Sequence, residues 1–132
     1  MRYATKKECS SLLAMLGEES LLACKRRNEP EASVGVSWVG DHIVTVENFE
    51  GQLIVRVTAV LPMMYGEEVE CRMHAAAMRE AGYYHLSSRS LSGFILAEVT
   101  VYGIPNTTHP AFRQEVETMC GKLDAICHHD VG

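Results

Sequence analysis

The sequence lacks the features that would indicate a membrane-spanning, secreted or nucleic-acid-binding protein. No apolar run approaches the roughly 20 residues that a membrane helix needs, and the start, MRYATKKECSS, has no apolar stretch of the kind found in signal peptides. Positive charge is also scarce, because 12 lysines and arginines stand against 17 acidic residues and the formal net charge is −5. The sequence therefore predicts a cytoplasmic chain without a membrane or nucleic-acid partner.

Motifs for catalysis and for structural metals are missing as well. There is no glycine-rich phosphate loop, no GxSxG, no HExxH and no paired-carboxylate motif. The cysteines are odd in number, widely spaced and without a CxxC pair, at Cys9, Cys24, Cys71, Cys120 and Cys127. In a chain without a secretory signal such cysteines are expected to be reduced. We therefore expect no enzyme activity and no cofactor.

What is present suits one globular domain over residues 1–132. The apolar fraction is 47% and the charged fraction 22%, both ordinary for a folded domain, and the length is sufficient for a core.

Three consecutive antiparallel strands are predicted between Ala32 and Leu61. Apolar side chains alternate there with other residues, which is the period of a strand, and Gly40-Asp41 and Glu50-Gly51 are turn signals. One face of the segment 52–61 is wholly apolar and consists of Leu53, Val55, Val57, Ala59 and Leu61. The opposite face is mixed and consists of Ile54, Arg56, Thr58 and Val60. This predicts a sheet with one side covered by helices.

Helical periodicity appears before, within and after the strands. Residues 5–16 predict a helix with Thr5 as N-cap, Glu8 at capping-box spacing and Gly17 at its end. The segment 18–24 either extends this helix or forms a short extended segment. The basic run 25–27 is expected to be a solvated link after the helix, with a phosphate-binding patch as the less favoured alternative. Further helices are predicted over 67–81 and from Pro110 to Cys127, with Thr108 or His109 as the cap of the last one.

A second hairpin is predicted from segments 83–88 and 94–102, joined by residues 89–93. Phe94, Leu96 and Tyr102 share one of its faces, which suits either a subunit contact or coverage by a helix of the same chain. The element order is then α-β-β-β-α-β-β-α, an α+β fold in which helices cover an antiparallel sheet.

This order resembles the type III secretion chaperone fold. Leu12-Leu13-Ala14-Met15-Leu16-Gly17 is similar to the end of that family's first helix, and Val34–Glu47 to its first hairpin. The segment Leu53–Pro62 resembles the third strand, and Phe94–Tyr102 followed by Phe112–Ile126 resembles the closing strand and last helix. The bacterial YbjN-like family shares the fold, and Gly82–Ile126 resembles it equally.

The resemblance implies a non-catalytic, dimeric chaperone that binds an unfolded segment of an effector and keeps it soluble. The predicted partner-binding residues are Leu12, Leu13, Leu16, Val34, Val36 and Trp38. The predicted dimer contacts are Val69, Met73, Ala76, Ala77, Phe94 and Leu96.

Two alternatives remain open. The first is a YbjN-like regulatory or stress-associated protein with the same fold. The second is a small metal-binding protein or enzyme that uses cysteine and histidine. Residues 127–130, Cys-His-His-Asp, carry metal-capable side chains, but adjacent residues do not easily converge on one tetrahedral ion. Cys71 and His74 point the same way on a helix, but no third group is apparent that would orient the base.

Overall fold

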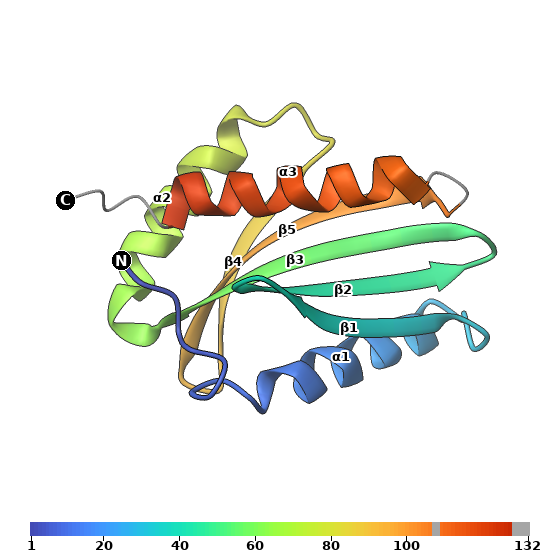
Figure 1. Ribbon diagram of the computed structural model, residues 1–132, viewed down its shortest axis with the longest axis horizontal. Coiled ribbons are helices and arrows are strands. Elements are labelled where there is room, and N and C mark those ends of the chain that lie inside the picture. Colours follow the sequence, from blue (N-terminus) through green and yellow to red (C-terminus); the bar gives the residue numbers. More distant parts are fainter. Residues whose placement is uncertain (107–108, 128–132) are drawn as a thin grey trace.

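The computed structural model describes residues 1–106 and 109–127. Three helices and five strands follow in the predicted order (Figure 1). Their bounds are α1 Leu12–Arg26, β1 Ser33–Val39, β2 His42–Phe49, β3 Gln52–Pro62, α2 Gly66–Arg79, β4 His85–Leu91, β5 Phe94–Pro105 and α3 His109–Cys127, with a short 3₁₀ turn, η1, at Met63–Tyr65. The predicted α+β architecture is confirmed. The predicted cap at Thr108 or His109 lies outside the side chains that are described.

The five strands form one antiparallel sheet in the order β1-β2-β3-β5-β4. Two tight turns set the register of its hairpins. Glu50-Gly51 joins β2 to β3 and Ser92-Gly93 joins β4 to β5, and all four residues have positive φ. Positive φ at both central residues is what a type I′ turn requires, and this turn matches the twist of the flanking strands.

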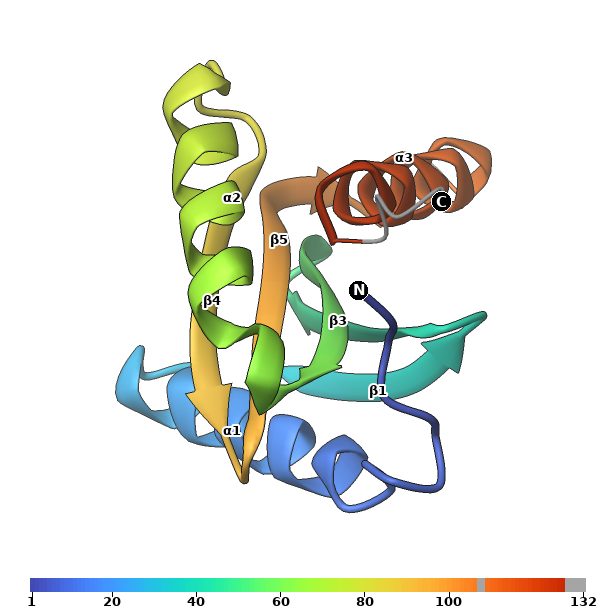
Figure 2. The ribbon, with the colours of Figure 1, turned by 90° about the vertical axis from the view of Figure 1, so that its left-hand side faces the viewer.

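Helices cover both faces of the sheet (Figure 2). Helices α2 and α3 lie on one face, which we call the α2–α3 face, and α1 lies on the other, the α1 face. The larger core fills the α2–α3 face and includes the predicted apolar side of β3. A smaller core lies under the N-terminal half of α1 and includes Leu12, Leu16, Ile43, Val60 and Leu96. The predicted mixed face of the sheet is therefore also covered, by α1, and it is apolar only under the N-terminal half of that helix.

The predicted capping box forms, yet the first helix starts later than expected. The backbone nitrogen of Thr5 donates to Oε1 of Glu8 at 3.0 Å, and that of Glu8 donates to Oγ1 of Thr5 at 3.2 Å. These reciprocal bonds close a turn, and α1 begins only at Leu12. The prediction of a helix over 5–16 is therefore wrong in its start, because a capping box stabilises a single turn whether or not a helix continues from it.

The predicted end of this helix at Gly17 is also wrong. The helix continues to Arg26, so the segment 18–24 extends it, and the basic residues 25–27 form its last turn and cap rather than a link. A Cβ atom at Gly17 would lie 3.2 Å from Cγ2 of Val36. The glycine therefore allows α1 to approach β1 closely. In the sequence alone, a glycine required for close packing cannot be distinguished from one that ends a helix.

The second hairpin is longer than predicted. Residues 89–91 belong to β4, so the predicted five-residue loop is a two-residue turn. At the other end β5 continues beyond Tyr102, because Gly103 forms a bulge: Ile54 pairs with Tyr102 and Leu53 with Ile104. Gly103 has φ of 74°, a conformation that suits glycine at a bulge. In the described part of the chain, no helix is long and apolar enough to cross a bilayer.

Candidate functional site

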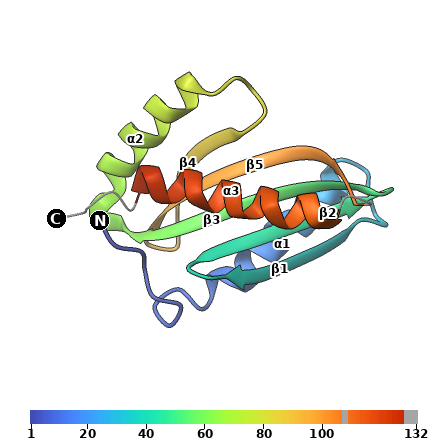
Figure 3. The same cartoon turned by 45° about the horizontal axis from the view of Figure 1, so that its top comes forward.

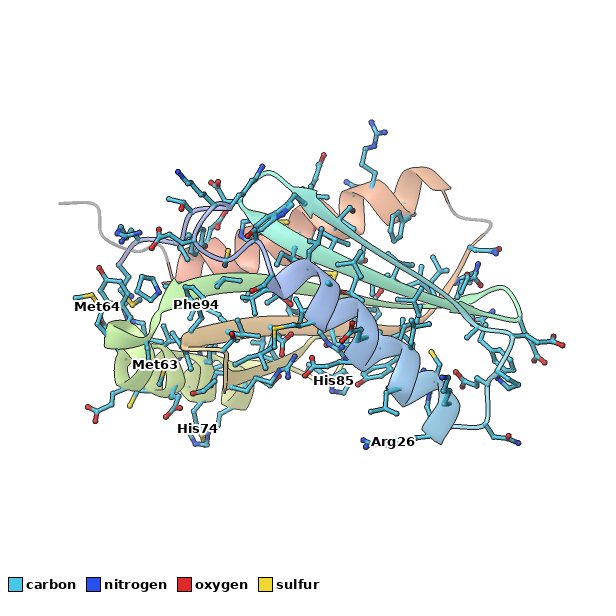
Figure 4. All side chains as sticks on the ribbon, turned by 90° about the horizontal axis from the view of Figure 1, so that it is seen from below. Arg26, Met63, Met64, His74, His85 and Phe94 are labelled. Carbon is cyan, nitrogen blue, oxygen red and sulfur yellow. The ribbon has the colours of Figure 1, made fainter. Side chains whose placement is uncertain are left out.

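A cleft of about 450 Å³ lies on the α1 face, between the C-terminal half of α1 and strands β3, β5 and β4. We call it the arginine cleft, because Arg26, Arg56 and Arg89 reach it from three different elements. In Figure 4, which views the molecule from the α1 side, Arg26 and His85 lie on the same side of that helix. The complete lining is Glu19, Leu22, Ala23, Arg26, Arg56, His85, Ser87, Arg89, Glu98, Thr100 and Tyr102.

Arg89 links α1 to a buried carboxylate of β5. Its Nη1 and Nη2 atoms donate to the two carboxylate oxygens of Glu19 at 2.9 and 2.7 Å, and its Nε donates to Oε1 of Glu98 at 2.7 Å. Glu98 is 3% exposed, and its other oxygen accepts a bond from the hydroxyl of Thr58 at 2.9 Å. The hydrogen bonds from Arg89 hold the pKa of Glu19 below its usual range. Both acidic groups of the cleft are thus engaged by one guanidinium.

Arg56 makes no hydrogen bond to a carboxylate among the described side chains, although its charge adds to the effect of Arg89 in lowering the pKa of Glu19. It is half-buried, and its Nε donates to Oγ1 of Thr100 at 3.2 Å. Arg26, in the last turn of α1, is exposed. Near them His85 and Tyr102 form an edge-to-face pair with ring centroids 5.1 Å apart. With three arginines against two glutamates, this part of an acidic protein has a surplus of positive charge.

A second hollow lies on the α2–α3 face. This groove, which we call the β1 groove, has a volume of about 440 Å³ and separates the N-terminal half of α3 from strands β1 and β2. Its floor and walls are mainly apolar. The lining residues are Ser37, Val39, Val44, Val46, Phe112, Arg113, Val116 and Glu117.

Strand β1 lies at the edge of the sheet (Figure 3), and its residues Ser37 and Val39 line this groove. It pairs only with β2 within the described chain, so about half of its backbone N–H and C=O groups point away from the sheet. Its sequence, SVGVSWV, contains no charge and no proline. Edge strands usually carry such residues to prevent pairing with other chains, so β1 is an unprotected edge.

The predicted partner-binding residues divide into buried and half-buried groups. Leu12 and Leu16 are 0% and 3% exposed and belong to the core under α1, so they hold α1 on the sheet in this fold. The other four are half-buried: Leu13, Val34, Val36 and Trp38. Of these, Leu13, Val36 and Trp38 pack against the same core. The structure thus brings the helix and strand residues together on the α1 face.

The predicted dimer residues also point mostly inward. Val69, Met73 and Ala76 of α2 face the chain's own sheet, and Leu96 lies in the core beneath α1; all four are buried, whereas Ala77 and Phe94 are half-buried. The exposed stripe of α2 consists instead of Cys71, His74, Ala75 and Met78, of which Met78 is 76% exposed. Met63, Met64 and Phe94 gather at the adjacent end of the sheet (Figure 4).

The cysteine and histidine candidates do not assemble into a site among the described residues. Within residues 1–106 and 109–127 no three metal-capable side chains converge. Cys71 and His74 are both exposed on α2, and the predicted tail residues 128–130 lie outside the described range. Burial raises the pKa of Cys120 to about 11 and that of Cys127 to about 12, so both remain thiols near neutral pH and are poor nucleophiles.

One polar cluster joins the N-terminal segment, β2 and α3, and consists of Tyr3, His42 and Asp124. Oδ1 of Asp124, on α3, accepts a hydrogen bond from the hydroxyl of Tyr3 and lies 2.9 Å from Nε2 of His42. The rings of Tyr3 and His42 contact edge to face. This arrangement anchors the N-terminal segment and the β1–β2 hairpin to α3.

The sequence interpretation missed the arginine cleft. Its signal was Arg56, an arginine within an otherwise apolar strand, together with Glu98 in the facing strand. Neither residue identifies the ion pair that closes the cleft, because this pair joins Glu19 to Arg89, 70 positions apart in the sequence.

In comparisons with protein-family models, with curated proteins and with solved structures, no significant match to this chain was found.

Proposed function

We propose that this protein is a non-catalytic, dimeric, cytoplasmic chaperone-like protein that binds an extended segment of a partner polypeptide, as expected for type III secretion effector chaperones. The observation that supports this most is the uncharged, unprotected edge of β1 beside an apolar groove. The element order, which is that of the family the sequence resembles, supports it independently.

Binding would proceed by addition of a strand to the sheet. An extended partner segment would pair with the outward-pointing backbone groups of β1, which supply affinity without reading sequence. Every second side chain of that segment would then lie over the β1 groove, where Val39, Val46 and Phe112 offer apolar contact. Partial burial of apolar partner side chains would keep the segment extended and prevent its aggregation.

The dimer contact that we propose differs from the one predicted from sequence. Because Val69, Met73 and Ala76 serve the chain's own core, the second copy would contact the exposed stripe of α2. Ala75 lies between Cys71 and Met78 on that stripe, and its small side chain would allow two antiparallel helices to approach closely.

The strand-addition proposal is tested with one edge variant and one matched control. A partner captured from the native host is identified, purified and titrated against the protein and against Val39→Lys and Leu21→Lys. Val39 and Leu21 are similarly exposed, at 43% and 47%, but only Val39 borders the β1 groove. We expect Val39→Lys to weaken binding at least ~10-fold and Leu21→Lys to change it less than ~2-fold.

Hydrogen exchange supplies the second readout. The amides of β1 should exchange more slowly when the partner is bound, because a new ladder protects them. Unchanged exchange in β1, or equal effects of the two lysine variants, would contradict strand addition. For the dimer, light scattering at micromolar concentration should give twice the mass of one chain. The Met78→Glu variant should give the mass of a single chain. A monomeric parent protein would refute the dimer.

A further inference from the structure

We infer that the arginine cleft is a binding site for a small organic oxyanion, a carboxylate or phosphate attached to an apolar or planar group. This site lies on the opposite face of the sheet from the β1 groove, so it is separate from the proposed polypeptide-binding surface. The inference depends on the distribution of charge within the cleft.

The two carboxylates of the cleft are already engaged by Arg89. Glu98 accepts bonds from Arg89 and Thr58, and Glu19 accepts two bonds from the same Arg89. A cation entering the cleft would therefore have to compete with Arg89 for these carboxylates. The acidic groups thus hold Arg89 and α1 in place, and three guanidinium charges against two carboxylate charges leave the cleft with one positive charge in excess.

Arg56 provides the attraction for an anion. Its Nε donates to the hydroxyl of Thr100 and its charge adds to the effect of Arg89 in lowering the pKa of Glu19, but no described side chain accepts a hydrogen bond from its Nη atoms, so these donors are available to a ligand. A half-buried guanidinium loses part of its hydration, and this favours an opposite charge beside it. A guanidinium presents parallel N–H donors that match the two oxygens of a carboxylate or phosphate. Arg26, from α1, adds a second positive charge to the same cleft.

The remaining walls suit the body of an organic ligand. Leu22 and Ala23 of α1 line one side, and the ring of Tyr102, held against His85, lines another. The volume of about 450 Å³ lies within the range of small-molecule sites. An apolar or aromatic group carrying one anionic head would match both parts of the cleft, whereas a bare inorganic ion would contact the arginines alone.

The test titrates the protein with four probes of matched size and watches backbone amide resonances by NMR. Benzoate and phenyl phosphate carry the anionic head as carboxylate or phosphate, benzamide is the neutral analogue and benzylamine the cationic one. We expect saturable shifts of residues around Arg56 and Thr100 with benzoate, phenyl phosphate or both, and none with the other two. Which anion binds more tightly identifies the head group.

Three variants locate the site. Arg56→Met should weaken anion binding at least ~10-fold, since a charge-assisted hydrogen bond is lost. Arg26→Met should weaken it ~2- to 5-fold, since Arg26 is more exposed. Arg79→Met removes the same charge from α2, across the sheet, and should leave binding within ~2-fold. Circular dichroism verifies folding, and Arg26→Met carries the test alone if Arg56→Met does not fold.

The inference is overturned if neither anion binds below about 10 mM, if benzamide binds as tightly as benzoate, or if Arg56→Met and Arg79→Met behave alike. Loss of polypeptide binding in Val39→Lys would not affect it, because that variant lies on the other face. The two proposals therefore fail independently.

Discussion

Replacing Arg89 by methionine should reveal how strongly α1 depends on the buried carboxylate of Glu98. Methionine retains most of the apolar stem but removes the guanidinium, so Glu98, at 3% exposure, keeps only the hydroxyl of Thr58 as a partner. Leaving a buried charge without its partner costs about 3–5 kcal/mol. The Arg89 side chain is 36% exposed, so water can reach the site and replace part of the lost interaction. We therefore expect a loss of about 2–3 kcal/mol.

The other carboxylate bound to Arg89 provides the contrast. The side chain of Glu19 is 43% exposed, and exposed ion pairs contribute less than about 1 kcal/mol. Glu19→Gln should therefore destabilise the protein by less than that amount, although it removes the charge of Glu19 and one of its two bonds from Arg89. The comparison separates the burial of a charge from the number of its hydrogen bonds.

The assay is urea unfolding at pH 7, followed by the fluorescence of Trp38 and by far-ultraviolet circular dichroism. A double-mutant cycle completes it: Glu98→Gln should destabilise the parent protein but stabilise the Arg89→Met variant by about 1 kcal/mol, because glutamine carries no charge to leave unpaired. Our reasoning would be refuted if Arg89→Met cost no more than Glu19→Gln, or if the effects of Arg89→Met and Glu98→Gln were additive.

Three further predictions concern glycines and thiols. Gly121→Ala, in α3, places the new Cβ with no neighbouring atom within 4 Å and should raise the free energy of unfolding by about 0.5–1 kcal/mol. Gly17→Ala should gain less, because its Cβ would press on Val36, unless Val36 is also shortened to alanine. Equal gains for the two glycine variants in urea unfolding would contradict the close contact between Gly17 and Val36. Cys71, the exposed thiol, should react first with a thiol reagent in the native state, and Cys71→Ser should remove the fast phase; a fast phase that survives would place the reactive thiol elsewhere. Burial raises the pKa of Cys127 from 9.0 to about 12, so the contribution of the buried thiol to folding stability is complete below pH 9 and is lost as pH rises toward 12. Cys127→Ala should therefore reduce the fall in the free energy of unfolding between these pH values, measured under reducing conditions. An unchanged slope would exclude the thiol as the cause of that fall.

Strand positions could be predicted because their signals are local. The alternation in 52–61 and the turn at Glu50-Gly51 depend on residues adjacent in sequence, and β2 and β3 form where they indicate. Helix limits were predicted less well because each of their signals has two causes. Gly17 would suit a helix end or a close approach, and only the position of Val36 distinguishes them. The capping-box residues Thr5 and Glu8 likewise stabilise a turn that does not continue into α1.

The predicted binding residues show the same limit. The stripe Val69, Met73 and Ala76 was identified as the apolar side of α2, which is correct, but apolarity does not tell whether a side chain meets its own sheet or a second copy. The predicted choice for Leu96, between subunit contact and coverage by a helix of the same chain, is decided for coverage, because α1 packs over it. Each of these outcomes depends on contacts between segments distant in sequence.

The sequence by itself determined the elements, their order and the apolar face of β3, because backbone periodicity and turn chemistry act over a few residues. The tertiary structure alone decided that the mixed face is also covered, that its charged end forms the arginine cleft, and that β1 is an open edge. The arginine cleft forms where α1 brings Glu19 to Arg89, 70 residues away, above the buried Glu98. The edge position of β1 follows from the strand order. The effect of a charge on the free energy of folding depends on how deeply it is buried, and burial is a property of the folded chain rather than of any segment.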